Sequence, residues 1–168
     1  NQVCPEYREY ERLCTTVINS YIGPKVKFYL SELTNFLKRR IENENYYITQ
    51  SNGGISDYTF IENFPINTFL SGPSMGVCAA IELARKKKIN NFVTFDVGGT
   101  STDFSFGING KVNKTDMKEI NGYPLRMQMF DIDTIGIGGG SICKFDDGWL
   151  LNVGPESAGS NPGPVCYG

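Results

Sequence analysis

The stretch that decides the fold runs from Phe95 to Asp103 and reads Phe-Asp-Val-Gly-Gly-Thr-Ser-Thr-Asp. It leaves a β-rich run at residues 92–95. It enters residues 104–108, where aliphatic and aromatic residues alternate with smaller or polar ones, as in a half-buried strand. The sequence therefore predicts a tight polar turn between two antiparallel strands.

This turn carries the residue types that hold a phosphate and a metal ion. Adjacent glycines let backbone amides approach a phosphate closely, and hydroxyls add donors. Asp96 is a candidate Mg²⁺ ligand, directly or through water, with Asp103 as support. The Gly-Lys-Ser/Thr of a P-loop is absent. The alternative is a polar β-turn in which Asp and Gly serve turn geometry alone. The predicted phosphate contacts are Gly98, Gly99, Thr100, Ser101 and Thr102.

A second glycine-rich segment follows a strand predicted over residues 127–135. Asp131 and Asp133 alternate along this strand, so both are expected to face one side, a geometry suited to sharing a cation or polarising a water. The triple glycine permits close approach to a ligand or to another loop. An interdomain turn with two solvated carboxylates explains the segment equally well. The substrate-side candidates are Asp131, Asp133, Gly138, Gly139, Gly140 and Ser141.

Two further motifs have an open interpretation. Residues 71–76 join a strand predicted at residues 66–70 to a helix, where free amides favour an anion. The alternative is a plain helix start with Pro73 near the first turn. Glu156 lies in a Gly- and Pro-rich stretch that is either the wall of a pocket or an ordered surface loop.

The remaining pattern indicates a mixed α/β architecture. Helical spacing over about residues 5–42 is interrupted at Gly23-Pro24, which predicts two helices or one kinked helix. Residues 46–49 read as a strand, residues 57–63 as a capped helical turn and residues 77–88 as a helix. Asn109-Gly110 and the turn at residues 146–148 predict hairpins, while residues 122–126 and the tail from Gly154 read as irregular. The helical segment is thus followed by an α/β part of about residues 46–168.

Composition removes several classes of function. A net charge of −2 argues against nucleic acid or an anionic membrane as partner. No apolar run approaches the ~20 residues of a membrane helix. With no histidine, His-based catalysis and His-bound metal are excluded. Five cysteines without C-x-x-C spacing fit a reducing, cytoplasmic location. Because the chain begins at Asn1 without an initiator Met, we expect a piece of a longer protein.

Six motifs together resemble the hydantoinase A/oxoprolinase family, in order and in spacing. The resemblance spans nearly the whole chain and implies an actin-like, ribonuclease-H-type ATPase fold with ATP in a cleft between two domains. Members include 5-oxoprolinases, N-methylhydantoinases and subunits of acetone and acetophenone carboxylases. The motifs lie at residues 9–19, 50–54, 71–73, 95–103, 131–141 and 154–167.

The resemblance implies that this chain is the central fragment of an ATPase domain. Residues 96–103 resemble the second phosphate loop of actin-like ATPases, and the first loop is expected before Asn1, so the chain should hold half of a nucleotide site. Implied cofactors are ATP and Mg²⁺. Implied partners are a small cyclic amide and the rest of the same polypeptide, with a hydantoinase B-type subunit as a candidate.

The expected function is therefore ATP-dependent hydrolysis of a cyclic amide, in which phosphorylation activates a lactam or imide ring for opening. Asp133 stands where many hydantoinase-type members have His and oxoprolinases often have Asn, so the substrate cannot be carried over from either subgroup. The alternatives are a nucleotide-binding subunit of a ketone carboxylase and a non-catalytic actin-like ATPase module. The fragment alone is expected to be inactive.

Overall fold

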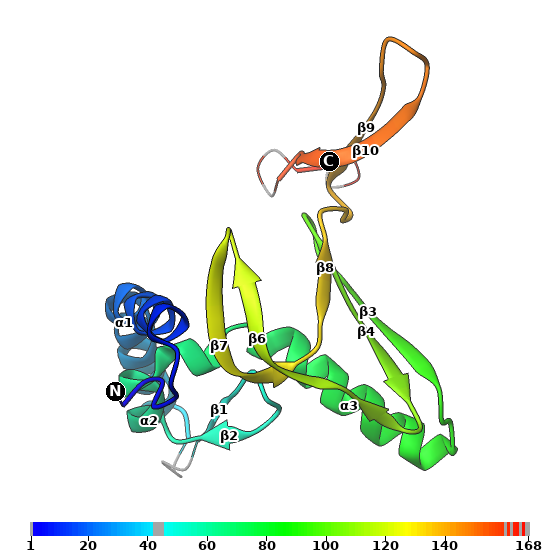
Figure 1. The fold of residues 1–168 in the computed structure, drawn as a ribbon. Coiled ribbons are helices and arrows are strands. Elements are labelled where there is room, and N and C mark those ends of the chain that lie inside the picture. Colours follow the sequence, from blue (N-terminus) through cyan, green and yellow to red (C-terminus); the bar gives the residue numbers. More distant parts are fainter. Residues whose placement is uncertain (1, 42–45, 160, 162, 165, 167–168) are drawn as a thin grey trace. The chain divides into compact units, whose positions relative to one another are not determined.

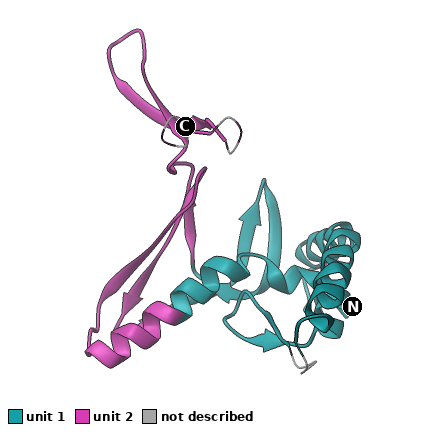
Figure 2. Ribbon diagram, turned by 180° about the vertical axis from the view of Figure 1, so that it is seen from behind, with its two compact units in different colours: residues 1–78, 113–131 teal, residues 79–112, 132–168 magenta. Residues whose placement is uncertain are grey.

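The structure is a computed structural model that describes residues 2–41, 46–159, 161, 163, 164 and 166. The chain divides into two compact units, Asn1–Cys78 with Asn113–Asp131, and Ala79–Val112 with Ile132–Gly168. Figure 2 colours them teal and magenta, and the boundary falls inside helix α3 (Ser71–Lys87). Each unit is therefore built from two separate stretches of sequence, which we call unit 1 and unit 2.

Unit 1 is built around helix α1 (Glu9–Lys38), a 30-residue helix that contains Pro24. Of the two alternatives predicted from Gly23-Pro24, two helices or one kinked helix, the structure therefore has a single helix that runs through Pro24. Proline removes a single backbone donor, and the backbone hydrogen bonds on both sides keep the helix continuous. Two buried polar side chains attach α1 to the rest of unit 1. Thr15 Oγ1 accepts from the amide of Arg126 at 2.9 Å, and the Asn19 side chain accepts from the amide of Ile66 at 3.2 Å.

The core of unit 1 is a cluster of fully buried side chains, Ile66, Leu125 and Met129. Ile66 lies on the short helix η1 (Pro65–Thr68), and the other two lie on strand β7 (Tyr123–Phe130). Figure 1 shows α1 beside β7 in this part of the chain, and η1 also packs against α1. Packing of these three elements removes the apolar faces from water, which is the main stabilising contribution in a small domain.

The segment between α1 and α3 differs in part from the prediction. Strands β1 (Ile48–Thr49) and β2 (Ile55–Ser56) pair across a turn at residues 50–54. Helix α2 (Tyr58–Asn63) begins at the predicted cap, where the Asp57 carboxylate accepts from the amide of Phe60 at 2.8 Å. The strand predicted at residues 66–70 is wrong. Residues 65–68 form η1, because Pro65 at the first position presets a helical φ.

The hairpin of β6 (Lys114–Ile120) and β7 corrects a second prediction, since residues 122–126 are not a loop. The turn is Asn121-Gly122, with φ of 50° and 83°, as two-residue hairpin turns require. The strand predicted over residues 127–135 is also divided. β7 ends at Phe130, and β8 (Asp133–Ile135) belongs to unit 2.

Unit 2 contains the sheet formed by β3 (Phe92–Val97), β4 (Thr102–Ile108), β5 (Lys111–Val112) and β8. β3 and β4 are antiparallel, as predicted, and β5 and β8 pair with different ends of β4. The hairpin at Asn109-Gly110 is confirmed, but only β5 returns along β4. Strand β6, which follows β5 in the sequence, belongs to unit 1.

Unit 2 also holds the hairpin of β9 (Ser141–Phe145) and β10 (Leu151–Ser157), orange in Figure 1. The Asp146 carboxylate accepts from the amides of Leu150, at 3.0 Å, and Gly148, at 2.9 Å. These hydrogen bonds, the Leu150 amide first, hold the pKa of Asp146 below its usual value. β10 extends through Ser157, so the tail from Gly154 is more regular than predicted.

Two whole-chain features complete the fold. Within the described residues, no helix combines the length and the apolar character that crossing a bilayer demands. All five cysteines are free thiols.

Candidate functional site

The predicted phosphate turn lies between β3 and β4, as the sequence indicates. The amide of Gly98 donates to the carbonyl of Ser101 at 2.9 Å and closes the turn. Asp96 and Asp103 are direct partners in the β3–β4 register, so their side chains share one face of the sheet. The neighbouring pair, Phe95 and Phe104, stacks with ring centroids 6.2 Å apart and takes the other face.

The tip of the turn presents hydrogen-bond donors that the protein does not use. Among the described residues, no acceptor takes the amide hydrogens of Gly99, Thr100 or Ser101. The same holds for the hydroxyls of Thr100 and Ser101, and Gly99 and Thr100 are exposed. Successive free amides with adjacent hydroxyls are hydrogen-bond donors of the kind that bind phosphate oxygens.

The triple-glycine loop packs directly against this turn, backbone to backbone. Gly139 donates its amide hydrogen to the carbonyl of Gly98 at 2.9 Å, and Gly140 donates to the carbonyl of Gly99 at 2.6 Å. A Cβ added at Gly138 would lie 2.6 Å from the Gly98 oxygen, closer than a real Cβ comes. The glycines are therefore needed for a close approach of two loops, the second of the two uses predicted for them.

Three hydroxyl groups fix this junction and are engaged within the protein. Thr102, only 6% exposed, donates its hydroxyl hydrogen to the carbonyl of Ile137 at 2.6 Å. Ser141 Oγ accepts from the amide of Gly138 at 2.8 Å. Thr134 donates to Asp103 Oδ1 at 2.5 Å. Sequence analysis did not single out Thr134, and its place in the β4–β8 register beside Asp103 is what reveals it.

A third segment completes the junction from the end of β10. The amide of Ala158 donates to the carbonyl of Gly140 at 2.8 Å, and a Cβ at Gly140 would meet Ser157 Oγ at 3.0 Å. Glu156, one of the sequence candidates, forms an exposed ion pair with Lys144 at 2.7 Å. Glu156 thus lies on the surface, as in the second of its two interpretations.

The predicted pairing of Asp131 with Asp133 on one strand is wrong. Asp131 follows β7 in unit 1, where its amide donates to the carbonyl of Asn113 at 2.9 Å. Asp133 begins β8 in unit 2 and pairs with Phe104, which places it on the sheet face opposite to Asp103. The two carboxylates therefore do not form a shared site along one strand.

The residues present fit a Mg²⁺ ion that comes with a bound phosphate. Asp96 and Asp103 are the only carboxylates of the turn itself, and the described residues contain no group of three metal-ligating side chains. Mg²⁺ commonly takes one or two carboxylates together with substrate phosphates and waters, so such a pair suffices. The Asp96 carboxylate receives no hydrogen bond from any described residue.

Motifs from the first half of the chain meet in unit 1 instead. Ser74 Oγ, just after Ser71-Gly72-Pro73, donates to the carbonyl of Ser51 at 2.9 Å. A Cβ at Gly53 would lie 2.7 Å from the Phe130 ring. Burial raises the pKa of the adjacent Cys78 thiol. Ser51 and Gly53 of the motif at residues 50–54 therefore take part in the packing of unit 1, and Ser71 of the motif at residues 71–73 lines a cavity.

Comparison with known proteins identifies relatives over almost the full chain. A family model described as hydantoinase/oxoprolinase matches residues 12–168. The chain is 36% identical to caprolactamase subunit alpha of Pseudomonas jessenii over 168 residues, which cover 100% of this chain and 24% of that protein. It is 33% identical to 5-oxoprolinase of Dictyostelium discoideum, with 99% of this chain and 14% of that protein covered.

Solved structures show the same fold. The crystal structure of the ATP-dependent caprolactamase from Pseudomonas jessenii matches with a TM-score of 0.80 and 36% identity, over 99% of this chain and 24% of that chain. A nucleotide-free acetone carboxylase matches with a TM-score of 0.80 and 26% identity, over 94% of this chain and 22% of that chain. The chain thus spans about a quarter of these relatives or less.

Proposed function

This chain belongs to the hydantoinase/oxoprolinase family, and we propose that it is part of an ATP-dependent enzyme that opens a cyclic amide. The observation that carries the proposal is the turn at residues 98–101, whose free amides and hydroxyls match the needs of a phosphate. Two relatives, a caprolactamase and a 5-oxoprolinase, bear the names of lactam-opening enzymes. We also assign the actin-like ATPase fold, because a glycine turn between antiparallel strands is its phosphate element.

Within this proposal, the residues of unit 2 divide into two roles. Gly99, Thr100 and Ser101 contact phosphate oxygens, and Asp96 holds Mg²⁺ or the water bound to it. Thr102, Ser141 and the triple glycine keep the turn in shape, since their polar groups already form hydrogen bonds within unit 2. Preorganised donors of this kind stabilise charge on a transferring phosphoryl group.

ATP would supply the phosphoryl group that activates the lactam oxygen, after which water adds to the carbonyl carbon and the ring C–N bond breaks. The acyl phosphate that remains would be hydrolysed by a second water, so that the lactam, ATP and two waters yield the open-chain amino acid, ADP and phosphate. The chain's own contribution is to bind and orient the phosphates. The complete active site would also include parts of the polypeptide or of a partner subunit beyond these residues. A reducing, cytoplasmic location remains a prediction.

The test is ATP-dependent phosphate release by the full-length protein, with ε-caprolactam, 5-oxoproline or hydantoin added separately. We expect at least one lactam to raise phosphate release and to appear as its ring-opened product. ATP turnover that no cyclic amide alters would contradict the proposal.

A ketone carboxylase is the second candidate, because the acetone carboxylase structure matches with the same TM-score of 0.80. The lower identity, 26% against 36% for caprolactamase, places it second. An arm of the same assay with acetone and bicarbonate separates the two, since only a carboxylase would couple ATP turnover to acetoacetate formation.

A further inference from the structure

We propose that a cavity in unit 1 is a binding site for an uncharged cyclic amide, which deepens the proposed function by naming where the ring is held. The cavity has a volume of about 310 Å³, at the lower end of the ~300–1,000 Å³ typical of small-molecule sites. This size suits a single small ring, and every lining residue belongs to unit 1. Its lining residues are Val26, Tyr29, Leu30, Leu33, Tyr47, Ile48, Thr49, Ile61, Thr68 and Ser71.

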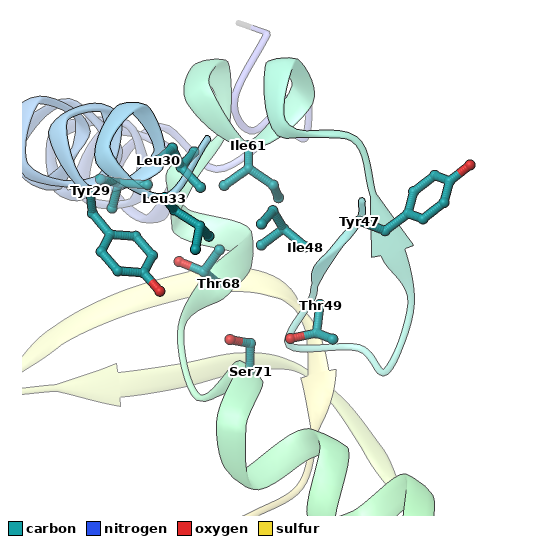
Figure 3. A pocket seen from close by; sticks show the side chains of 10 residues that line it. Tyr29, Leu30, Leu33, Tyr47, Ile48, Thr49, Ile61, Thr68 and Ser71 are labelled. Carbon is teal, nitrogen blue, oxygen red and sulfur yellow. The ribbon is translucent and has the colours of Figure 1, made fainter. Parts of the chain in front are cut away.

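The cavity has one apolar wall. Leu30 and Leu33 come from α1, Ile48 from β1 and Ile61 from α2, and Figure 3 shows these four side chains gathered together. Leu30 and Ile61 are almost fully buried, at 2% and 0% exposed. A wall of this kind takes up a stretch of methylene groups, each of which gains about 0.8 kcal/mol on leaving water.

The opposite side of the cavity is polar but uncharged. Figure 3 shows Ser71 and Thr49 on the side away from Leu30 and Ile61, with Thr68 between Leu33 and Ser71. Thr68 donates its hydroxyl hydrogen to the carbonyl of Pro65 at 2.8 Å, so this oxygen is left as an acceptor. No described residue takes the hydroxyl hydrogens of Thr49 or Ser71, so these two remain donors.

An acceptor beside donors is the complement of a cis amide. In a lactam ring the C=O and N–H groups lie next to each other on one edge, and the methylene groups form the rest of the ring. The N–H would donate to Thr68 Oγ1, the C=O would accept from the Ser71 hydroxyl, and the methylene groups would lie against Leu33 and Ile48. An open-chain trans amide presents its two polar groups on opposite sides and does not match.

The lining also separates lactams by charge. None of its ten residues is charged, so a carboxylated lactam such as 5-oxoproline would lose water from its carboxylate without gaining a cationic partner. The cavity is therefore expected to prefer a neutral ring, for which ε-caprolactam is the probe.

The experiment is calorimetric titration of the full-length protein with ε-caprolactam and with 5-oxoproline, in the absence of nucleotide. We expect caprolactam to bind more tightly than 5-oxoproline. Ser71→Ala should weaken caprolactam about fivefold, the effect of one neutral hydrogen bond of ~1 kcal/mol. The control is Ser20→Ala, which removes an exposed serine hydroxyl from α1 and should leave caprolactam affinity unchanged.

A second variant, Leu33→Trp, fills the cavity with an indole ring and should abolish caprolactam binding while the thermal unfolding curve confirms a folded protein. Equal affinities in Ser71→Ala and Ser20→Ala, or tighter binding of 5-oxoproline, would overturn the assignment. The wild-type phosphate-release assay is scored separately. If lactams stimulate turnover but Ser71→Ala does not change the affinity for caprolactam, only the cavity assignment is refuted. If caprolactam binds in the cavity but no lactam stimulates turnover, only the proposed function is refuted.

Discussion

Unit 1 and the candidate site in unit 2 are each stabilised in a different way. Unit 1 is stabilised by side chains that fill its core, with Leu125 and Met129 almost completely buried. The candidate site in unit 2 is shaped by missing side chains, because Gly138 and Gly140 let one loop touch another through backbone atoms. Deleting side-chain atoms should therefore damage unit 1, and adding them should damage the phosphate turn.

The largest effect is expected in the core of unit 1. Leu125→Ala removes a fully buried side chain and should lower the free energy of unfolding by about 3 kcal/mol, because lost burial and a residual cavity both contribute. Denaturant unfolding measures this loss. The control is Leu83→Ala at an exposed position of α3, expected within about 0.5 kcal/mol of wild type. Similar losses in both variants would refute a side-chain-filled core.

The next effect concerns the glycine junction. Gly138→Ala places a Cβ 2.6 Å from the Gly98 oxygen and should weaken ATP binding by about tenfold or more, since overpacking costs ~1–3 kcal/mol. Gly136→Ala is the matched control, because nothing lies within 4 Å of its added Cβ. Titration of ATP into full-length variants decides the matter. An ATP affinity of Gly138→Ala equal to that of wild type would refute the claim that added side-chain atoms disturb the phosphate turn.

A smaller effect is expected from the hydroxyl that ties the turn to the second loop. Thr102→Val keeps the side-chain shape but removes the donor to the Ile137 carbonyl, and should weaken ATP about fivefold. Thr102→Ser retains the hydroxyl and should restore most of the affinity. If Ser and Val variants bind ATP equally, the hydroxyl has no positioning role.

The smallest effect is a pH dependence at the β9–β10 turn. The pKa of Asp146 is lowered by amide donors in the folded state, so its contribution to stability is present above its unfolded pKa near 3.8. That contribution is lost as pH falls through the lower folded value. Thermal unfolding between pH 6 and pH 2 should therefore show a steeper acid loss for wild type than for Asp146→Ala. Parallel curves would contradict this assignment.

Sequence alone predicted the strand–turn–strand unit because its signals are local. Asn109-Gly110 and the alternation after Asp103 act within a few residues. The turn at Asn121-Gly122 carried the same signal, and the expectation of a loop at residues 122–126 overlooked it. The docking of Gly139 and Gly140 on the turn is nonlocal, so composition suggested a close approach without naming its partner. The cavity beside Ser71 is likewise lined by residues from three stretches, 26–33, 47–49 and 61–71, which only the fold brings together.

The central claim is that the turn at residues 98–101 binds the phosphates of ATP. Amide hydrogen exchange in the full-length protein, with and without ATP and Mg²⁺, tests it most directly. Slower exchange is expected at Gly99, Thr100 and Ser101 on nucleotide binding, with no change at the Asn121-Gly122 turn of unit 1. Unchanged exchange at these three amides under saturating ATP would contradict it.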